Sequence, residues 1–341
     1  MGVSIKDIAK KVNRSITTVS RALNDYDDVS PETKKLILET AKEMGYSPNT
    51  FAQRLQKQQS ETIGLIIPTF SPRFSDPFFS ELLAGIGNKA ADLGFDLLVS
   101  TRSPGPEEID TYKKLIEGHR VDGVIVVRTR EQDARISYLL ANKFPFVAFG
   151  RTNAEEPFPY VDEDGYYGMQ LIADHLAGLG HGIIGCLTPD PDLAFTQKRL
   201  AGLRDGLAKF GIKLLEKYIK SGDLTQRSGF ELGGALLDLE ERPTAIAACN
   251  DLMAFGVISA AQKRGLEVGK DISITGFDDI PMSEYSHPTL TTVHQPVYKI
   301  GSMICEMLIK IIREEIEENQ HVLLKPKLVI RQSTGFNHSQ V

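Results

Sequence analysis

The feature that most limits the fold is an alternation of short apolar runs with helical segments, which starts at Thr62. One series contains TIGLIIP, FDLLVS, DGVIVV and FPFVAFG, and a second series after Asp164 contains HGIIGCL, YIKSGD, TAIAACN and ISITGFDD. Apolar strands that alternate with helices predict a parallel sheet covered on both faces. Two such series predict two doubly wound lobes, with a ligand between them at the carboxyl ends of the strands.

Charge divides the chain differently. Residues 1–60 contain ten Lys and Arg against seven Asp and Glu, which gives +3, whereas the other 281 residues contain 29 against 38, which gives −9 and the total of −6. Contact with phosphate depends on the local field rather than on the total charge. The basic N-terminal segment is therefore a candidate nucleic-acid-binding module.

Three short helices are predicted in this segment. Ser4, Ser15 and Ser30 are the expected N-caps, and Gly45 ends the third helix. Two helices joined by a tight turn indicate a helix-turn-helix, and three helices in about 45 residues can share one small core. The residues predicted to fill this core are Ile5, Ile8, Ala9, Val12, Val19, Ala22, Leu23, Leu36, Ile37, Ala41 and Met44.

The second helix, SITTVSRALN, places hydroxyl side chains and an arginine toward solvent. A recognition helix in the major groove needs short polar side chains near its N-terminus and a longer donor for guanine or phosphate. Ile16, Thr17 and Arg21 fit that description. The other explanation is that these hydroxyl groups only cap and cover a surface helix.

A family resemblance supports the DNA-binding interpretation. Residues 3–55, VSIKDIAKKVNRSITTVSRALNDYDDVSPETKKLILETAKEMGYSPNTFAQRL, resemble the DNA-binding head of the lactose/galactose repressor (LacI/GalR) family, and the resemblance continues to RQSTGF near the end. It implies an α/β fold: a three-helix helix-turn-helix head and a two-lobed, doubly wound core like that of periplasmic binding proteins. The expected domains are a head of 1–48, a hinge helix and linker of 49–60, a first lobe of 61–162 with 294–325, and a second lobe of 163–293 with 326–336.

The resemblance also implies which residues contact DNA. In the hinge helix, Asn49 is the expected N-cap, Ala52 packs hinge against hinge, and Leu55 enters a base step from the minor groove. The alternative for Leu55 is that it closes the core of the head. The full expected DNA-binding set is Ser15, Ile16, Thr17, Thr18, Ser20, Arg21, Asn24, Asn49, Ala52 and Leu55.

Residues after the strands are the expected effector contacts. By resemblance, one of Phe78 and Phe79 stacks on the ligand while the other packs inward, and Arg199 binds hydroxyl groups or a carboxylate. Two core phenylalanines and an internal salt bridge are the structural alternatives. Asn250 and Asp278 follow apolar strands, although either also fits as a helix N-cap.

Leu224 stands where relatives often have an aromatic ring, so Phe149 or Phe195 is expected to supply the missing surface. Acids, an amide and an arginine around aromatic rings suit a polyhydroxylated ligand. The expected effector set is Phe78, Phe79, Phe149, Phe195, Arg199, Leu224, Asn250 and Asp278.

The sequence lacks the motifs of common enzymes, namely GxSxG, HExxH, a P-loop, and GxGxxG after the first strand, so neither catalysis nor a cofactor is expected. The acids 162–164 are interpreted as non-catalytic, with Asp164 capping the next helix. Cys186, Cys249 and Cys305 are expected to be buried free thiols, and His181 a structural hydrogen-bonding residue.

The combined prediction is a homodimeric transcriptional regulator. We expect a repressor of a carbohydrate-utilisation operon, released from palindromic double-stranded operator DNA by a mono- or disaccharide. A co-repressor type that responds to a purine or nucleoside is the alternative, followed by a sugar-binding protein or a doubly wound enzyme. No leader or membrane-spanning segment is recognised, which predicts a cytoplasmic protein without a membrane partner, and no leucine heptads follow Phe336, which favours a dimer over a tetramer.

Overall fold

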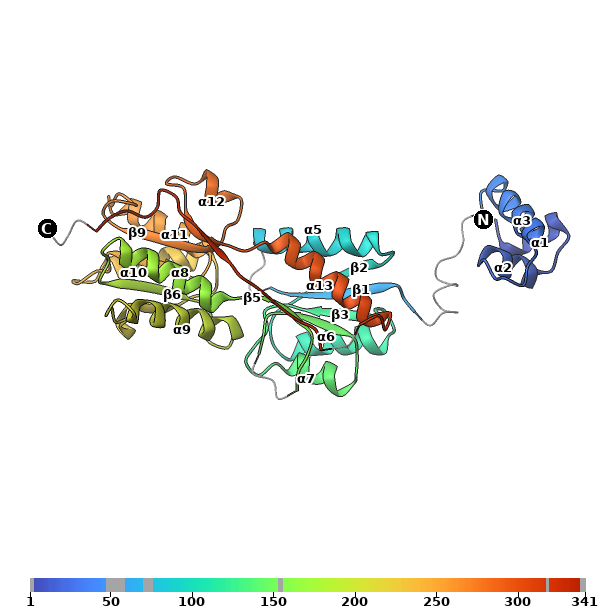
Figure 1. The fold of residues 1–341 in the computed structure, drawn as a ribbon, viewed down its shortest axis with the longest axis horizontal. Helices are drawn as coiled ribbons and strands as arrows, with labels where there is room; N and C mark the ends of the chain where they lie inside the picture. Colours follow the sequence, from blue (N-terminus) through green and yellow to red (C-terminus); the bar gives the residue numbers. More distant parts are fainter. Residues whose placement is uncertain (1–2, 47–58, 70–75, 153–155, 317–318, 338–341) are drawn as a thin grey trace. The chain divides into compact units, whose positions relative to one another are not determined.

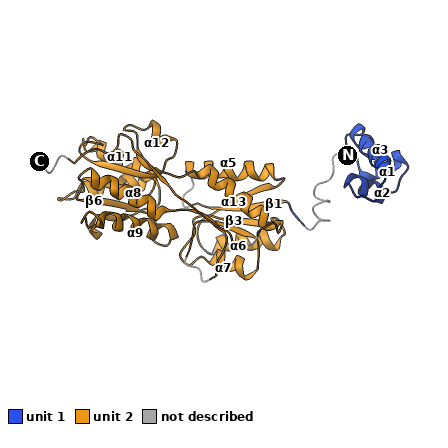
Figure 2. Cartoon of the chain, viewed as in Figure 1, with its two compact units in different colours: residues 1–60 blue, residues 61–341 orange. Residues whose placement is uncertain are grey.

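The structure, a computed structural model, describes residues 3–46, 59–69, 76–152, 156–316 and 319–337. The chain divides into two compact units, residues 1–60 and 61–341 (Figures 1 and 2). Within the described ranges, no helix combines the length and the hydropathy needed to cross a bilayer.

The first unit contains three helices, as predicted: α1 (Ile5–Val12), α2 (Ile16–Leu23) and α3 (Pro31–Glu43). The side chains of Ser15 and Ser30 accept hydrogen bonds from the backbone of α2 and α3, which confirms both N-caps. Asn13 ends α1 with a φ of 50°, a left-handed conformation that asparagine tolerates better than most residues. This turn sets the short connection between α1 and α2.

The core of this unit joins all three helices through Ile8, Val19 and Ile37, which are completely buried. The prediction that Leu36 belongs to this core was wrong, because its side chain is 46% exposed. Ile37 and Ala41 lie on the inward face of α3. Leu36, which precedes Ile37, lies about 100° around the helix from it and therefore on another face.

The second unit contains two lobes, each built on a six-stranded sheet. The sheet of the first lobe has the order β11-β5-β4-β3-β1-β2, and all neighbours are parallel. Its strands are β1 (Thr62–Pro68), β2 (Asp96–Arg102), β3 (Gly123–Val126), β4 (Phe146–Phe149), β5 (Tyr160–Glu163) and β11 (His321–Leu324). Its helices are α5 (Pro77–Asp92), α6 (Pro106–Glu117), α7 (Ala134–Ala141) and α13 (Val297–Ile312).

Strand β1 shows why both faces of this sheet are covered. Ile63 and Leu65 pack with α5 and α13 in one buried cluster, whereas Ile66 packs with α6 and α7 in another. Successive side chains of a strand point to opposite faces, so a run of apolar residues serves two layers of helices. Figure 1 shows α5 and α13 on one side of the sheet and α6 and α7 on the other.

The second lobe has the sheet order β12-β10-β9-β8-β6-β7. Its strands are β6 (Ile184–Thr188), β7 (Ile219–Ser221), β8 (Ala245–Ala248), β9 (Ser273–Asp278), β10 (Thr291–His294) and β12 (Lys327–Val329). Its helices are α8 (Gly165–Gly178), α9 (Ala194–Ala208), α10 (Gln226–Leu237), α11 (Asp251–Lys263) and α12 (Met282–Tyr285), with a short 3₁₀ helix at Glu216–Tyr218.

Several structural predictions for this lobe are confirmed. His181 is buried, and its ring nitrogens lie 3.0 Å from the Thr244 hydroxyl and 2.9 Å from the Ser273 hydroxyl. It therefore ties the start of the lobe to its sheet. Cys186 and Cys249, like Cys305 in α13, are buried and free.

The sheets differ from the prediction in three respects. Strands β5 and β11 were not predicted, because each has only four residues. The β5 sequence YVDE contains two acids, and the β11 sequence HVLL alternates exposed with half-buried side chains. Strand β2 is half exposed at the edge of its sheet and not a buried strand. Strand β12 runs antiparallel to β10. The chain leaves the second lobe through β10 and returns through β12, so these two strands have opposite directions.

The chain passes between the lobes three times. It crosses after β5 through Asp164, after β10 through Gln295 and Pro296, and after β11 through Lys325 and Pro326. Since each crossing follows the carboxyl end of a strand, the polar residues there face the space between the lobes.

Candidate effector pocket and DNA-binding helix

A pocket lies between the two lobes at the carboxyl ends of their parallel strands. It encloses about 820 Å³ including its open mouth, a size that suits a small molecule. All eight residues predicted to bind the effector line it: Phe78, Phe79, Phe149, Phe195, Arg199, Leu224, Asn250 and Asp278. The fold thus brings together residues that are up to 200 positions apart in the sequence.

The first lobe contributes an aromatic wall. Asp76 caps α5 by accepting a hydrogen bond from the Phe78 backbone, and the Phe78 ring stacks on Phe149 with centroids 5.7 Å apart and planes 6° apart. Phe79 is buried in the core beneath the Arg128 guanidinium, whose carbon lies 4.9 Å from the ring centroid. Phe78 is therefore the more accessible ring of the pair, whereas Phe79 is buried and packs in the core.

Arg199 of α9 lines the pocket from the second lobe. Its guanidinium carbon lies 3.6 Å from the centre of the Phe277 ring, and Nη1 donates a 2.5 Å hydrogen bond to the Cys249 carbonyl. The Nε atom is buried and has no hydrogen-bond partner. Arg199 has no ion pair with any described residue, so an internal salt bridge does not explain its position.

Asn250 and Asp278 differ in the hydrogen bonds that their side chains make within the protein. The Asn250 amide caps α11 by accepting from Met253 at 3.0 Å and donates to the Leu224 carbonyl at 3.0 Å, so capping explains much of its placement. Asp278 ends β9 and accepts from the Gln295 amide at 2.7 Å. It caps no helix, because the N-cap of α12 is Pro281. Burial raises the pKa of the Asp278 carboxyl well above its usual value.

The pocket contains acids that the sequence interpretation set aside. Asp162 forms a 2.7 Å ion pair with Arg151, and Asp76 forms a 3.1 Å ion pair with Arg128. Glu163 is 5% exposed, and both of its carboxylate oxygens are buried without a partner. Burial raises the pKa of Glu163 to about 9, against the opposing influence of the Arg199 charge. Asp164 caps α8, as predicted.

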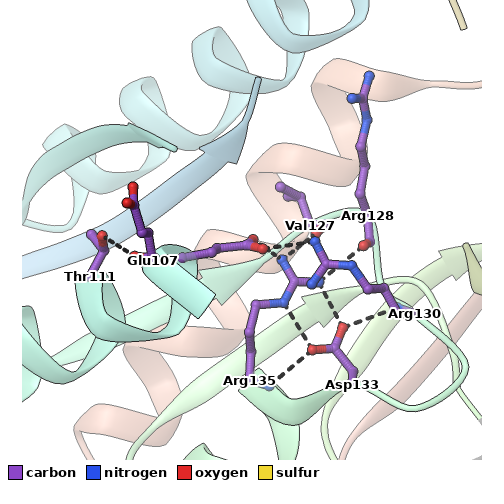
Figure 3. A network of polar contacts seen from close by, with 8 residues as sticks. Glu107, Thr111, Val127, Arg128, Arg130, Asp133 and Arg135 are labelled. Atoms are coloured by element: carbon purple, nitrogen blue, oxygen red, sulfur yellow. Dashed lines mark hydrogen bonds and ion pairs between the residues drawn. The ribbon is translucent and has the colours of Figure 1, made fainter. Parts of the chain in front are cut away.

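A second group of charges in the first lobe surrounds Arg135 and hydrogen-bonds the backbone of Arg128, a residue that lines the pocket (Figure 3). Arg135 donates to Glu108 at 2.7 Å, to Asp133 at 2.7 and 2.9 Å, and to the carbonyls of Val127 and Arg128. Arg130 also pairs with Glu108, at 2.7 Å. We call Glu108, Arg130, Asp133 and Arg135 the buried ion cluster. No local sequence pattern indicates this cluster, because its members come from two helices and a loop.

The loop held by the buried ion cluster contacts the opposite lobe. Ala194 donates its backbone N–H to the Thr129 carbonyl at 2.9 Å, and Glu131 donates to the Asp192 carbonyl at 3.1 Å. Thr129 and Arg128 also line the pocket. These two backbone hydrogen bonds join the lobes beside the ligand site.

The predicted recognition helix presents part of its predicted set to solvent. Ile16, Thr17 and Arg21 are exposed, whereas Thr18 and Ser20 are half-buried. Ser15 caps α2, and the Asn24 amide donates to the Ser20 carbonyl at 2.9 Å. The Arg21 guanidinium pairs with the Asp28 carboxylate at 2.8 and 2.9 Å. The predicted hinge residues Asn49, Ala52 and Leu55 lie outside the described residues.

A helix-turn-helix unit followed by a two-lobed pocket defines a DNA-binding regulator that responds to a ligand. Residues 4–49 match the model of the bacterial regulatory proteins of the lacI family, and residues 173–334 match that of the periplasmic binding protein-like domain. The HTH-type transcriptional regulator DegA of Bacillus subtilis (strain 168) is 32% identical over 98% of this chain and 99% of its own length.

Solved structures agree with these matches. A lac repressor dimer bound to operator and the anti-inducer ONPF is 29% identical, with a TM-score of 0.86 over 98% of this chain and 100% of the other. A complex of the transcriptional regulator CelR with cellobiose is 28% identical, with a TM-score of 0.76 over 97% of this chain and 99% of the other. The chain belongs to the LacI family. It is a DNA-binding transcriptional regulator with an effector-binding core, and not an enzyme.

Proposed function

We propose that the protein is a homodimeric repressor of a carbohydrate-utilisation operon, and that a neutral mono- or disaccharide releases it from a palindromic operator. The chemistry of the pocket supports this proposal. Phe78 and Phe149 offer apolar ring surface, while Arg199 and Asp278 offer a donor and an acceptor beside them. Sugars combine apolar C–H faces with hydroxyl groups that both donate and accept. The cellobiose complex of CelR agrees with this choice.

DNA binding is proposed to use the exposed face of α2. Ile16 and Thr17 are short enough for base edges in the major groove, and Arg21 is long enough for guanine or phosphate. We further propose that residues 49–60 connect each head to its core, with Asn49, Ala52 and Leu55 as the hinge contacts. A sugar that binds closed lobes better than open ones then changes operator affinity through thermodynamic linkage.

The experiment is operator binding by the purified full chain, measured by fluorescence anisotropy on its own upstream promoter and on a shuffled duplex. We expect preference for the promoter, and dissociation when one compound of a neutral sugar panel is added. Tighter promoter binding in the presence of a purine or nucleoside would replace the inducer assignment with a co-repressor assignment. Equal affinity for both duplexes would contradict operator recognition at this promoter.

A further inference from the structure

Two groups in the pocket stand apart from the rest. Among the pocket-lining side chains that the structure describes, only Glu163 and Arg199 have buried polar atoms without a hydrogen-bond partner: both oxygens of the acid and Nε of the arginine. The other pocket acids already have protein partners, namely Arg128, Arg151 and Gln295. A buried polar group without a partner is destabilising, so a ligand that supplies the missing hydrogen bond binds more tightly.

These two groups belong to one small region of the pocket. Gly165 follows Glu163 by two residues, and a Cβ atom on it would lie 3.1 Å from Cγ and 3.2 Å from Nε of Arg199. The glycine therefore leaves the space in which the arginine side chain lies. The Arg199 charge is also the strongest influence that lowers the pKa of Glu163. The two side chains nevertheless form no ion pair with each other.

The ligand group that fits them must do two things at once. Because the pKa of Glu163 is about 9, its carboxyl keeps its proton at neutral pH, and the ligand must accept from this O–H and donate to the carbonyl oxygen. It must also accept from the N–H of Arg199. A hydroxyl group donates and accepts through one oxygen, and two hydroxyls on adjacent carbons match the two oxygens of a carboxyl group. A carboxylate or a fully ionised phosphate has no proton to donate to the carbonyl oxygen of Glu163, so that buried acceptor would stay without a partner.

We propose that Glu163 and Arg199 together bind a pair of adjacent hydroxyl groups on an uncharged effector, with the Glu163 carboxyl as donor and acceptor and Arg199 as a second donor. This assignment rests on the proposed effector site and deepens it, because it makes Glu163 a specificity-determining residue. The shared chemistry occurs in neutral sugars and in the ribose of ribonucleosides. It is absent from free purine bases and from 2′-deoxyribonucleosides.

The test is a binding panel on the full chain, read by thermal shift and by calorimetric Kd. The panel contains glucose, galactose, ribose and cellobiose, their amino and acidic counterparts glucosamine and glucuronate, and adenosine and cytidine with their 2′-deoxy forms and free adenine. We expect binding only of neutral compounds with adjacent hydroxyls. Glu163→Leu should weaken the Kd of the best compound at least about tenfold, or about 1.4 kcal/mol, since it removes both the donor and the acceptor, whereas Glu163→Gln keeps a donor and an acceptor and should weaken it less.

A matched variant separates this effect from damage to the fold. Glu117→Leu makes the same chemical change on the exposed end of α6 and should leave the Kd unchanged. The unliganded thermal midpoint of Glu163→Leu should not fall, because the removed carboxyl has no protein partner to lose. Loss of ligand without loss of stability identifies a binding residue.

The outcomes distinguish the two proposals. Equal Kd values for wild type and Glu163→Leu, or a best ligand that is anionic, amino-substituted, deoxygenated or a free base, would overturn the role assigned to Glu163. A ribonucleoside that binds while every sugar fails would support that role and overturn the sugar effector. If no compound with adjacent hydroxyls binds to the wild type, both proposals fail.

Discussion

Arg135 is a buried arginine and Arg199 a half-buried arginine of the same unit, and the two differ in how many hydrogen bonds they make to the protein. All five N–H groups of Arg135 donate to carboxylates or carbonyls of the protein (Figure 3). Arg199 donates one hydrogen bond to the described part of the chain, to the Cys249 carbonyl, and its buried Nε atom has no partner there. A charged group whose donors are all hydrogen-bonded within the protein stabilises the fold, whereas a group with a free donor can hydrogen-bond a ligand.

The buried ion cluster also positions residues that line the effector pocket. The buried ion cluster fixes residues 127–133, and from this loop Arg128 and Thr129 face the pocket. The same loop accepts and donates the backbone hydrogen bonds that reach Ala194 and Asp192 of the other lobe. A ligand site gains precision when the loops around it are held by a rigid supporting layer.

The largest expected effect comes from breaking the buried ion cluster. Arg135→Ala leaves Glu108 and Asp133 buried with an important partner removed, which should lower the free energy of unfolding by about 3 to 5 kcal/mol. Urea denaturation measures it. Arg227→Ala is the control, because that arginine pairs with Glu231 on the surface and should cost at most about 0.5 kcal/mol. Similar losses in both variants would remove the distinction between cluster and surface.

Arg199→Ala tests the other side of the comparison. It removes the free Nε donor and one charge-assisted hydrogen bond, so effector binding should weaken by about 1.5 to 3 kcal/mol. Operator release is then expected only at roughly tenfold to hundredfold higher sugar concentration. Dose-response anisotropy on the promoter duplex measures this shift. An unchanged dose would place the effector elsewhere.

Arg21 in the head is an intermediate case, because its partner Asp28 is also exposed and DNA has to displace it. Arg21→Ala should weaken operator binding by about 1 to 3 kcal/mol. Asp28→Asn is the informative partner variant, since it frees the arginine and removes a negative charge near the phosphates. It should therefore tighten binding. Equal weakening on promoter and shuffled duplex would limit Arg21 to phosphate contact.

The smallest expected effect concerns the pH dependence of stability at Glu163. Burial raises its pKa to about 9, while the neighbouring charges of Arg199, Asp278, Asp162 and Asp164 act in both directions. The folded state therefore retains a proton that the unfolded state releases, and stability falls as the pH rises from about 4.5 toward 9. Glu163→Gln lacks this loss.

Between pH 6 and pH 8 the wild type should lose about 1 kcal/mol relative to Glu163→Gln, less than a fully coupled proton would give, because the pocket is open to water. Thermal unfolding of both proteins in a series of buffers measures the difference. Parallel pH profiles would show that Glu163 ionises normally in the fold.

Much of the fold was predictable because local patterns reported it. Serine caps marked the helices of the head, and the alternation of apolar runs with helices marked both sheets. The prediction failed where local signals were weak. Strand β11 has only four residues with an alternating exposure, and Leu36 could not be assigned to a helix face without its neighbours.

The pocket was predicted unevenly. Phe78, Arg199 and Asp278 came from family resemblance together with their positions after strands, and all three line the pocket. Glu163 was set aside because adjacent acids rarely act together, yet at the carboxyl end of β5 both it and Asp162 reach the pocket. Only the surroundings distinguish them, since Asp162 meets Arg151 and Glu163 meets no partner.

The class of the molecule could be predicted from the amino-acid sequence: a basic helix-turn-helix head, an α/β core of two lobes, and polar residues that follow the strands. These properties depend on helix caps, periodicity and charge along the chain, which act over a few residues. Which buried charges have hydrogen-bond partners became clear only from the three-dimensional packing. Hydrogen-bond partners such as Arg135 and Glu108 lie 27 positions apart, and their desolvation depends on everything packed around them, so no local pattern contains that information.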